Sequence, residues 1–220
     1  MNASLDTCIV IHLYKSDKRE LLYSPFEKLY IYEFLLETEL KNKDYDVYKK
    51  FLLDIEEGKV QVITNKDLIN NGIKGLFENY IEQYNYLFDQ GELYAVALAK
   101  AMGIATFASD DTKDKGPHET LVKEIIEDVI PFAFYELLFL KFLASEITID
   151  EMYSDFEQVN LKSMRERPMN FKNRMLSTAR RFTKKYGTER DLKWIDDYCL
   201  ERKIDLKNKM KELKSFLENM

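Results

Sequence analysis

The sequence predicts an α/β fold, a doubly wound parallel sheet of about five strands, followed by a helical C-terminal extension. Short β-prone segments alternate with helical ones in the first part of the chain, as in βαβ units. Gly58 and Gly103 stand where helices should end before strands. After Phe134 the pattern is entirely helical. A chain of 220 residues with 45% apolar content is long enough to bury a substantial core.

The elements follow one another in a regular order. The expected strands are residues 2–5, 28–32, 60–64, 104–108 and 129–132. The helical patterns cover residues 7–15, 33–41, 45–57, 67–87, 92–102 and 118–127. Thr148 and Glu151 form a capping box at the start of a later helix. We therefore expect an α/β domain over residues 1–165 and a basic helical extension over residues 166–220, with the boundary near Pro168.

Charge is distributed unevenly along the chain. Residues 162–220 contain 17 Lys and Arg against 9 Asp and Glu, a net charge of +8. Residues 1–161 contain 16 against 30, a net charge of −14. An acidic body with a basic tail suits a site for cations together with a separate surface for a polyanion. The alternative is a tail that docks on its own acidic body.

The sequence gives no sign of membrane insertion or secretion. The longest late apolar stretch, residues 130–144, contains Pro131, Glu136 and Lys141 and is too short to span a bilayer. The short apolar run near the N-terminus is not typical of a signal peptide. Two cysteines far apart in the sequence favour free thiols in a reducing compartment over a disulfide. We expect a cytoplasmic protein with no membrane partner.

Five acidic residues follow the expected strands or lie on the helices beside them. They are Asp6, Glu39, Glu92, Asp110 and Asp111. Each has an ordinary interpretation, because Asp6 and Asp110 are good helix N-caps, Glu92 complements a helix dipole and Glu39 suits a solvated position. Taken singly, these residues indicate structure more than function.

Helical phase changes that interpretation. At about 100° per residue, Glu39 falls on the same arc as Leu36 and Leu40, and Glu92 shares a face with small residues such as Ala99. A carboxylate on the apolar face of a helix is costly unless something compensates it. Several such carboxylates in one crevice would repel one another, and Mg²⁺ or Mn²⁺ prefers oxygen ligands. The pattern therefore predicts a metal site.

Four segments resemble the motifs of PIN-domain nucleases, in the order in which that family has them. Asp6 follows the first strand and opens a helix, and Glu39 resembles the second acidic element. Residues 89–99 are similar to the third element of one PIN branch, which contains a Gly-Glu pair. Residues 107–111, a strand followed by a serine and two aspartates, match the fourth element. The resemblance covers residues 1–135.

This resemblance implies a function as well as a fold. It implies a PIN-like parallel sheet, a Mg²⁺ or Mn²⁺ cofactor and hydrolysis of RNA phosphodiesters by an endoribonuclease. Many relatives are toxins of toxin–antitoxin pairs, so an antitoxin protein is one candidate partner, and others process RNA. The leading metal ligands are then Asp6, Glu92 and Asp111. Glu39 and Asp110 are either further catalytic ligands or groups that hold the ligands, and the Thr7 and Ser109 hydroxyls orient a carboxylate or the attacking water.

The tail carries a second set of candidate residues. Between residues 171 and 186 an apolar stripe lies on one helix face and basic residues on another, which suits packing on a body while contacting RNA phosphates. The candidate RNA-binding residues are Arg174, Arg180, Arg181, Lys184 and Lys185. A solvated basic face is the alternative. A short heptad stripe of Leu192, Cys199, Leu206 and Leu213 favours docking or a homodimer.

Two other functions compete with an active ribonuclease. One is a catalytically inactive PIN-fold binding protein that has kept a cation, and the other is a regulatory protein that acts through its helical tail. The complete set of acidic positions favours the active enzyme. His12 has no partner at metal-binding spacing in the sequence, which favours a structural or surface role for it.

Overall fold

The computed structural model describes residues 1–110, 126, 128–165 and 168–220. The chain divides into two compact units, Met1–Phe134 and Tyr135–Met220. The boundary that we expected at residues 165 and 166 therefore lies within the second unit. The α/β pattern fills the first unit and the all-helical pattern fills the second.

Five strands form an entirely parallel sheet in the first unit, which confirms the predicted fold class. The strands are β1 (Asn2–Leu5), β2 (Lys28–Tyr32), β3 (Val60–Ile63), β4 (Thr106–Ala108) and β5 (Ile130–Phe132). Their order is β3-β2-β1-β4-β5, so the chain moves outward from β1 to β3 and then returns to place β4 on the other side of β1. Pro131 is tolerated because β5 is an edge strand.

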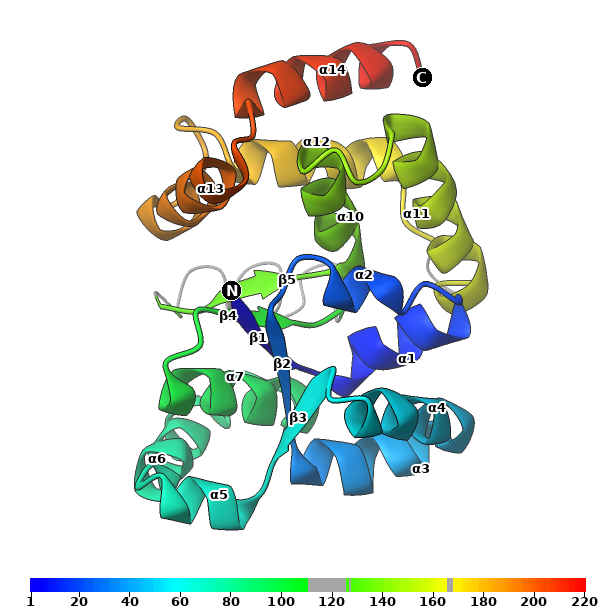
Figure 1. The fold of residues 1–220 in the computed structure, drawn as a ribbon. Coiled ribbons are helices and arrows are strands. Elements are labelled where there is room, and N and C mark those ends of the chain that lie inside the picture. The colour runs from blue at the N-terminus through cyan, green and yellow to red at the C-terminus, as the bar shows by residue number, and fades with distance from the viewer. Residues whose placement is uncertain (111–125, 127, 166–167) are drawn as a thin grey trace. The chain divides into compact units, whose positions relative to one another are not determined.

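Helices connect the strands and cover the sheet. They are α1 (Thr7–Lys15), α2 (Glu20–Tyr23), η1 (Leu35–Leu40), α3 (Lys41–Lys43), α4 (Tyr45–Glu56), α5 (Asn65–Asn70), α6 (Lys74–Tyr84) and α7 (Gln90–Met102). Crossover connections between parallel strands are right-handed. Connections that move one way across the sheet therefore cover one face, and connections that move the other way cover the opposite face. Figure 1 shows this arrangement, with α7 on one side of the sheet and α1 and α4 on the other.

Small residues let α7 lie close to the strands. Ala95, Val96 and Ala99 are fully buried on this helix. Gly103 ends α7 in the left-handed region, with φ 66°, as the sequence predicted. The close approach brings the N-terminus of α7 to the edge of the sheet where acidic residues follow the strands.

Several predicted elements differ in detail from the structure. The segment 33–41 contains the π-helical turn η1, in which the Lys41 N–H donates to the Leu36 carbonyl five residues earlier. The single helix predicted for residues 67–87 is two helices, because Gly72 adopts φ 70° between them. Helix α2 is too short for its periodicity to be detected. Of the helix predicted at 118–127, only residue 126 lies among the described residues, so the prediction is not tested.

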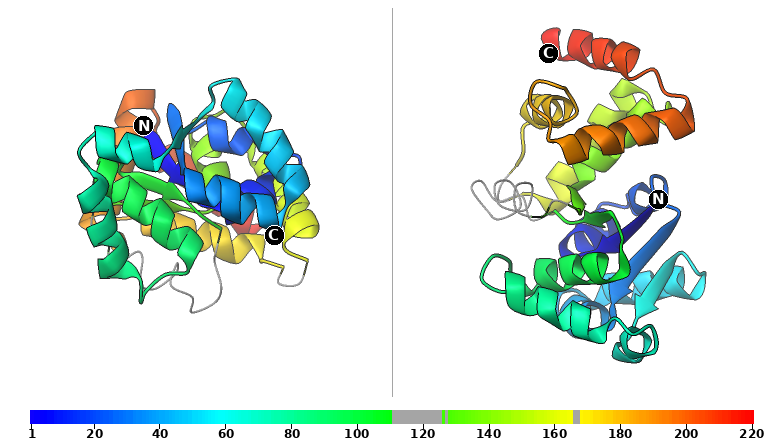
Figure 2. Two further views of the ribbon diagram at one scale, coloured as in Figure 1. Left: turned by 90° about the horizontal axis from the view of Figure 1, so that it is seen from below. Right: turned by 90° about the vertical axis from the view of Figure 1, so that its left-hand side faces the viewer.

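The second unit consists of helices. They are α10 (Phe134–Leu143), which starts at the last residue of the first unit, α11 (Ile149–Ser163), α12 (Phe171–Arg181), α13 (Glu189–Arg202) and α14 (Leu206–Glu218), seen from three directions in Figures 1 and 2. Thr148 caps α11 in the predicted capping box with Glu151. Cys199 and Leu213 of the heptad stripe are buried in this unit. The homodimer remains a prediction.

Three buried charged residues connect the helices of the second unit. The Arg181 guanidinium donates to Glu136 Oε1 at 2.7 Å and, through Nε, to Asp191 Oδ2 at 2.5 Å. Burial alone would lower the pKa of Arg181, but the charges of Glu136 and Asp191 outweigh it and raise that pKa. Arg181 therefore stays charged inside the unit and connects α10, α12 and α13.

In the parts of the chain that the structure describes, no helix combines the length and the apolar character that a membrane crossing requires.

Candidate functional site

Two of the candidate acidic residues, Asp6 and Asp110, follow β1 and β4, the neighbouring strands at which the chain changes its direction across the sheet. Open parallel sheets bind ligands at the carboxyl ends of strands at such a switch point. The Asp6 N–H donates to the Ala108 carbonyl at 3.0 Å, and the Ser109 N–H donates to the Phe132 carbonyl at 3.0 Å. Because these bonds extend the sheet beyond its strands, Asp6 and Ser109 lie side by side. The Ser109 hydroxyl donates to Asp6 Oδ2 at 2.9 Å.

The carboxylates of Asp6 and Glu39 converge beside Gly91, at the start of α7. A Cβ at Gly91 would lie 2.6 Å from Asp6 Oδ1 and 3.0 and 3.1 Å from the two carboxylate oxygens of Glu39. All three oxygens therefore lie within 3.1 Å of one point. Thr7 lies between the same two groups, since its hydroxyl donates to Glu39 Oε1 at 2.8 Å and to Asp6 Oδ1 at 3.4 Å.

Glu39 reaches this position from η1. π-helical turns are rare in proteins overall but are enriched at functional sites. Such a turn changes the direction in which side chains leave the helix. Oε1 of Glu39 accepts the Thr7 bond and also pairs with the Lys43 ammonium. Oε2 of Glu39 is buried and has no hydrogen-bond donor within the described residues. A buried oxygen with no donor is costly unless a ligand satisfies it.

The buried, acidic environment of Asp6 changes its pKa. The pKa is raised from 3.8 to about 6, and burial is the largest cause. Hydrogen bonds from the Cys8 thiol, at 2.7 Å, and from Ser109 lower the pKa, and the charges of Glu39 and Asp89 raise it. Burial and the neighbouring acidic residues therefore both make the charged form of Asp6 unfavourable.

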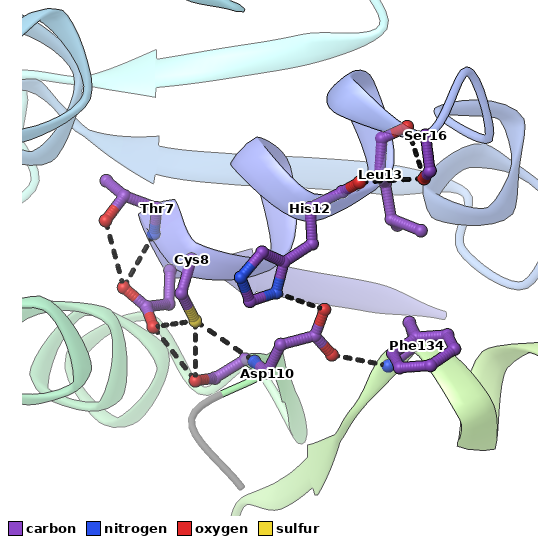
Figure 3. A network of polar contacts seen from close by, with 9 residues as sticks. Thr7, Cys8, His12, Leu13, Ser16, Asp110 and Phe134 are labelled. Carbon is purple, nitrogen blue, oxygen red and sulfur yellow. Dashed lines mark hydrogen bonds and ion pairs between the residues drawn. The ribbon is translucent and has the colours of Figure 1, made fainter. Parts of the chain in front are cut away.

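Asp110 lies in a polar network with Cys8, His12 and Phe134 that continues towards Thr7 (Figure 3). Its Oδ1 accepts the Phe134 N–H at 2.6 Å, and its Oδ2 lies 3.1 Å from His12 Nδ1. The Asp110 N–H donates to Cys8 Sγ at 3.1 Å. Both carboxylate oxygens of Asp110 thus contact protein groups, which suits a residue that connects the end of β4 to α1 and Phe134.

Cys8 connects the two parts of the site. Its thiol donates to Asp6 Oδ2 and lies 3.3 Å from the Ser109 hydroxyl. Burial raises the pKa of Cys8 well above its usual value, and the charges of Asp6 and Asp110 raise it further. The thiol therefore remains protonated, donates a hydrogen bond and is a poor nucleophile.

Two other predicted ligands have different positions. Glu92 is 1% exposed in the first turn of α7, next to Gly91, and its N–H donates to the capping carboxylate of Asp89 at 3.1 Å. Asp89 itself adds negative charge near Asp6. Asp111 lies outside the described residues. The structure thus brings Asp6 and Glu39 together, places Glu92 close by in the chain and assigns Asp110 to a supporting network.

The donors present fit a hard divalent cation in part. Asp6 and Glu39 supply carboxylate oxygens around one point, including the buried Glu39 Oε2, and such oxygens are what Mg²⁺ and Mn²⁺ prefer. Among the residues that the structure describes, no group of three or more His, Cys, Asp or Glu side chains has a spacing able to hold a metal ion. To complete its coordination, a cation bound by Asp6 and Glu39 would need a further carboxylate, water molecules or small side-chain rearrangements.

Several residues of this region were not predicted from the sequence as parts of the site. Cys8 and His12 stand four residues apart in α1, a spacing that puts them on one helix face, whereas the sequence patterns weighed for them were metal ligation and a Cys/His nucleophile. Lys43 stands four residues after Glu39, and Asp89 lies three residues before Glu92. Each of these spacings is a signal in the sequence that could have indicated the contact.

The predicted RNA-binding residues occupy different environments in the second unit. Arg180, Lys184 and Lys185 are exposed, and Arg174 is half-buried with its guanidinium 5.5 Å from the centre of the Tyr135 ring. Arg181 requires a correction, because its buried guanidinium binds Glu136 and Asp191 and is not presented to a phosphate. The helical phase that we used for Arg181 separated it from the apolar stripe but missed its two acidic partners.

Tyr186 adds an aromatic group to the exposed cations. It is 59% exposed, and the Arg180 guanidinium and the Lys185 ammonium lie 5.9 and 5.0 Å from the centre of its ring. We call Arg180, Lys184, Lys185 and Tyr186 the basic–aromatic patch.

The chain matches no protein-family model, no curated protein and no solved structure. The resemblance to PIN-domain nucleases is therefore an expectation that rests on the four sequence motifs.

Proposed function

We propose that this protein is a metal-dependent endoribonuclease of the PIN type. The observation that carries the proposal is the convergence of the Asp6 and Glu39 carboxylates beside Gly91, at the switch point of a parallel sheet. Burial and the charges of Glu39 and Asp89 make ionised Asp6 unfavourable unless a further cation binds beside it. A cytoplasmic location is part of the proposal, since both cysteines are free and RNA is the substrate.

The side chains of the site have separate tasks in this proposal. Asp6 and Glu39 bind the cation, with Glu92 and Asp111 as further candidates. Thr7 and Ser109 hold the two carboxylates through hydroxyl hydrogen bonds and so fix the directions of their oxygens. Asp110 accepts the Phe134 N–H and lies against His12, so its role is structural. When bound, Mg²⁺ or Mn²⁺ would activate water and offset the charge that develops on the phosphate.

An RNA cleavage assay tests this function. In Mn²⁺ the purified protein should cut single-stranded RNA, and EDTA should abolish the activity. Ser109→Ala removes a group that orients a ligand, so it should slow cleavage by roughly 10–100-fold. Asp6→Asn removes a ligand itself and should slow cleavage further. Asp46→Asn is the matched control, because Asp46 is 84% exposed and pairs only with Lys49 among the contacts described. Cleavage that survives both EDTA and Asp6→Asn would point to another mechanism or to a contaminant.

The basic–aromatic patch supports single-stranded RNA as the substrate class. Exposed cations neutralise phosphates, and an exposed aromatic ring stacks on unpaired bases. Neutralising Arg180, Lys184 and Lys185 to Gln should flatten the dependence of log Kd on log salt by about 0.7 per lost phosphate contact. The matched control replaces Lys207, Lys211 and Lys214, which are exposed on α14, and should leave the slope nearly unchanged.

If the basic–aromatic patch packs on the protein itself, the same variant should give the opposite result. If the patch instead docks on acidic residues of its own chain, the triple variant should melt at a lower temperature and keep the salt slope of the wild type. Tyr186→Ala separates the two cases further. It should weaken binding of single-stranded RNA by about 1–3 kcal/mol and affect duplex RNA much less.

A further inference from the structure

A lysine lies directly against the acidic site. Lys43 is the last residue of α3, four residues after Glu39, and its ammonium pairs with Glu39 Oε1. This is the oxygen that also accepts the Thr7 hydroxyl bond and lies 3.0 Å from the Cβ position at Gly91. The Lys43 ammonium thus binds one of the carboxylate oxygens that a divalent cation would need.

The position of the Lys43 side chain allows its ammonium to move away from Glu39. Its side chain is 53% exposed, whereas that of Glu39 is 13% exposed, so the pair lies at the solvent side of the site. Lysine carries a compact charge on a flexible four-carbon stem and holds no fixed bidentate geometry. Lys43 can therefore swing towards solvent while Glu39 remains in place. A divalent cation beside Glu39 would repel the ammonium at a few ångströms.

We propose that Lys43 is a mobile counter-cation of the acidic site, which balances Glu39 in the metal-free chain, yields this carboxylate to a divalent cation and then presents its ammonium to an RNA phosphate. This inference rests on the proposed function. The second step follows from the location, since a displaced ammonium stays tethered beside the cation, where the phosphate must also bind. Ammonium groups bind phosphates as point charges with three donors.

The chain contains a matched control for Lys43. Lys41 also forms an ion pair with a glutamate four residues earlier, Glu37, at 3.5 Å, and its side chain is 45% exposed. Glu37 is 51% exposed, in contrast to Glu39. Lys41→Met and Lys43→Met therefore remove the same charge from the same helix, and only one of them removes it from the acidic site.

Calorimetric titration with Mn²⁺ alone tests the first step. Lys43→Met should bind Mn²⁺ about tenfold more tightly than the wild type, because it removes a competing charge in direct contact with a ligand oxygen. Lys41→Met should change the affinity by less than about twofold, because exposed charges at larger distance are screened. In EDTA, Lys43→Met should also melt at a lower temperature than Lys41→Met and gain more from added Mn²⁺.

Binding of a short single-stranded RNA in saturating Ca²⁺ tests the second step. Lys43→Met should flatten the salt dependence of log Kd by about 0.7, the value for one lost phosphate contact, and Lys41→Met should not. An unchanged slope would overturn the phosphate role. Equal Mn²⁺ affinities of the wild type, Lys43→Met and Lys41→Met would show that Lys43 does not compete with the cation, and would leave the proposed function standing. No Mn²⁺ binding by any of them would overturn both.

Discussion

Replacing Arg181 by Met should lower the free energy of unfolding of the helical unit by about 3–5 kcal/mol. The substitution removes the cation that lies between Glu136 and Asp191, and both carboxylates are buried. A buried charge without its partner costs far more than the ion pair itself contributes. Trp194, the sole tryptophan of the sequence, is buried in the same unit, so its fluorescence during urea unfolding reports on this unit separately.

Arg180→Met is the control for this prediction. Arg180 is the preceding residue of the same helix and is exposed, so its loss should change stability by less than about 0.5 kcal/mol. Adding Glu136→Gln to Arg181→Met should recover part of the lost stability, because it removes one of the uncompensated charges. Equal effects of Arg180→Met and Arg181→Met would show that the three-residue network does not exist in solution.

Replacing Asp6 by Asn should stabilise the metal-free protein at neutral pH. The pKa of Asp6 is about 6 in the folded chain and 3.8 ordinarily, so ionising Asp6 opposes folding. The stability contributed by neutral Asp6 is complete below about pH 3.8 and is lost as the pH rises through about 6. Asp6→Asn keeps a neutral side chain, so in EDTA its effect on stability should be about 3 kcal/mol more favourable at pH 7.5 than near pH 4.

Urea unfolding of the first unit in EDTA, at pH 4 and at pH 7.5, measures this difference. Saturating Mn²⁺ at pH 7.5 should reverse the order of the two proteins, because the cation stabilises ionised Asp6 and has lost a ligand in the variant. If Asp6→Asn destabilises the protein equally at both pH values in EDTA, Asp6 is a structural helix cap and the charge repulsion that we infer is absent.

The strands and the residues that follow them were predictable from local pattern. Apolar runs bounded by turns gave β1 and β2 with their observed limits, and alternation with helices indicated parallel pairing. Parallel strands present their carboxyl ends at one edge, which is why Asp6 and Ser109, the residues that follow β1 and β4, lie close together.

The partners of the acidic residues were not predictable in the same way. Helical phase identified Glu39 as facing inward, but it assumed an α-helix where the chain forms a π-helical turn. It gave no indication that Lys43 would fold back on Glu39. Likewise, Arg181 appears in the sequence as one of several basic residues, and its acidic partners lie 45 residues before it and 10 residues after it. Such pairings depend on tertiary packing, which a local pattern does not contain.

A crystal structure of the protein soaked in Mn²⁺, with anomalous scattering recorded, tests the central claim most directly. We expect an anomalous peak beside Gly91 at about 2.0–2.3 Å from carboxylate oxygens of Asp6 and Glu39, with the Lys43 ammonium no longer on Glu39. An absence of anomalous density at this position under saturating Mn²⁺, with Lys43 still paired to Glu39, would contradict the assignment of a divalent cation to the acidic site.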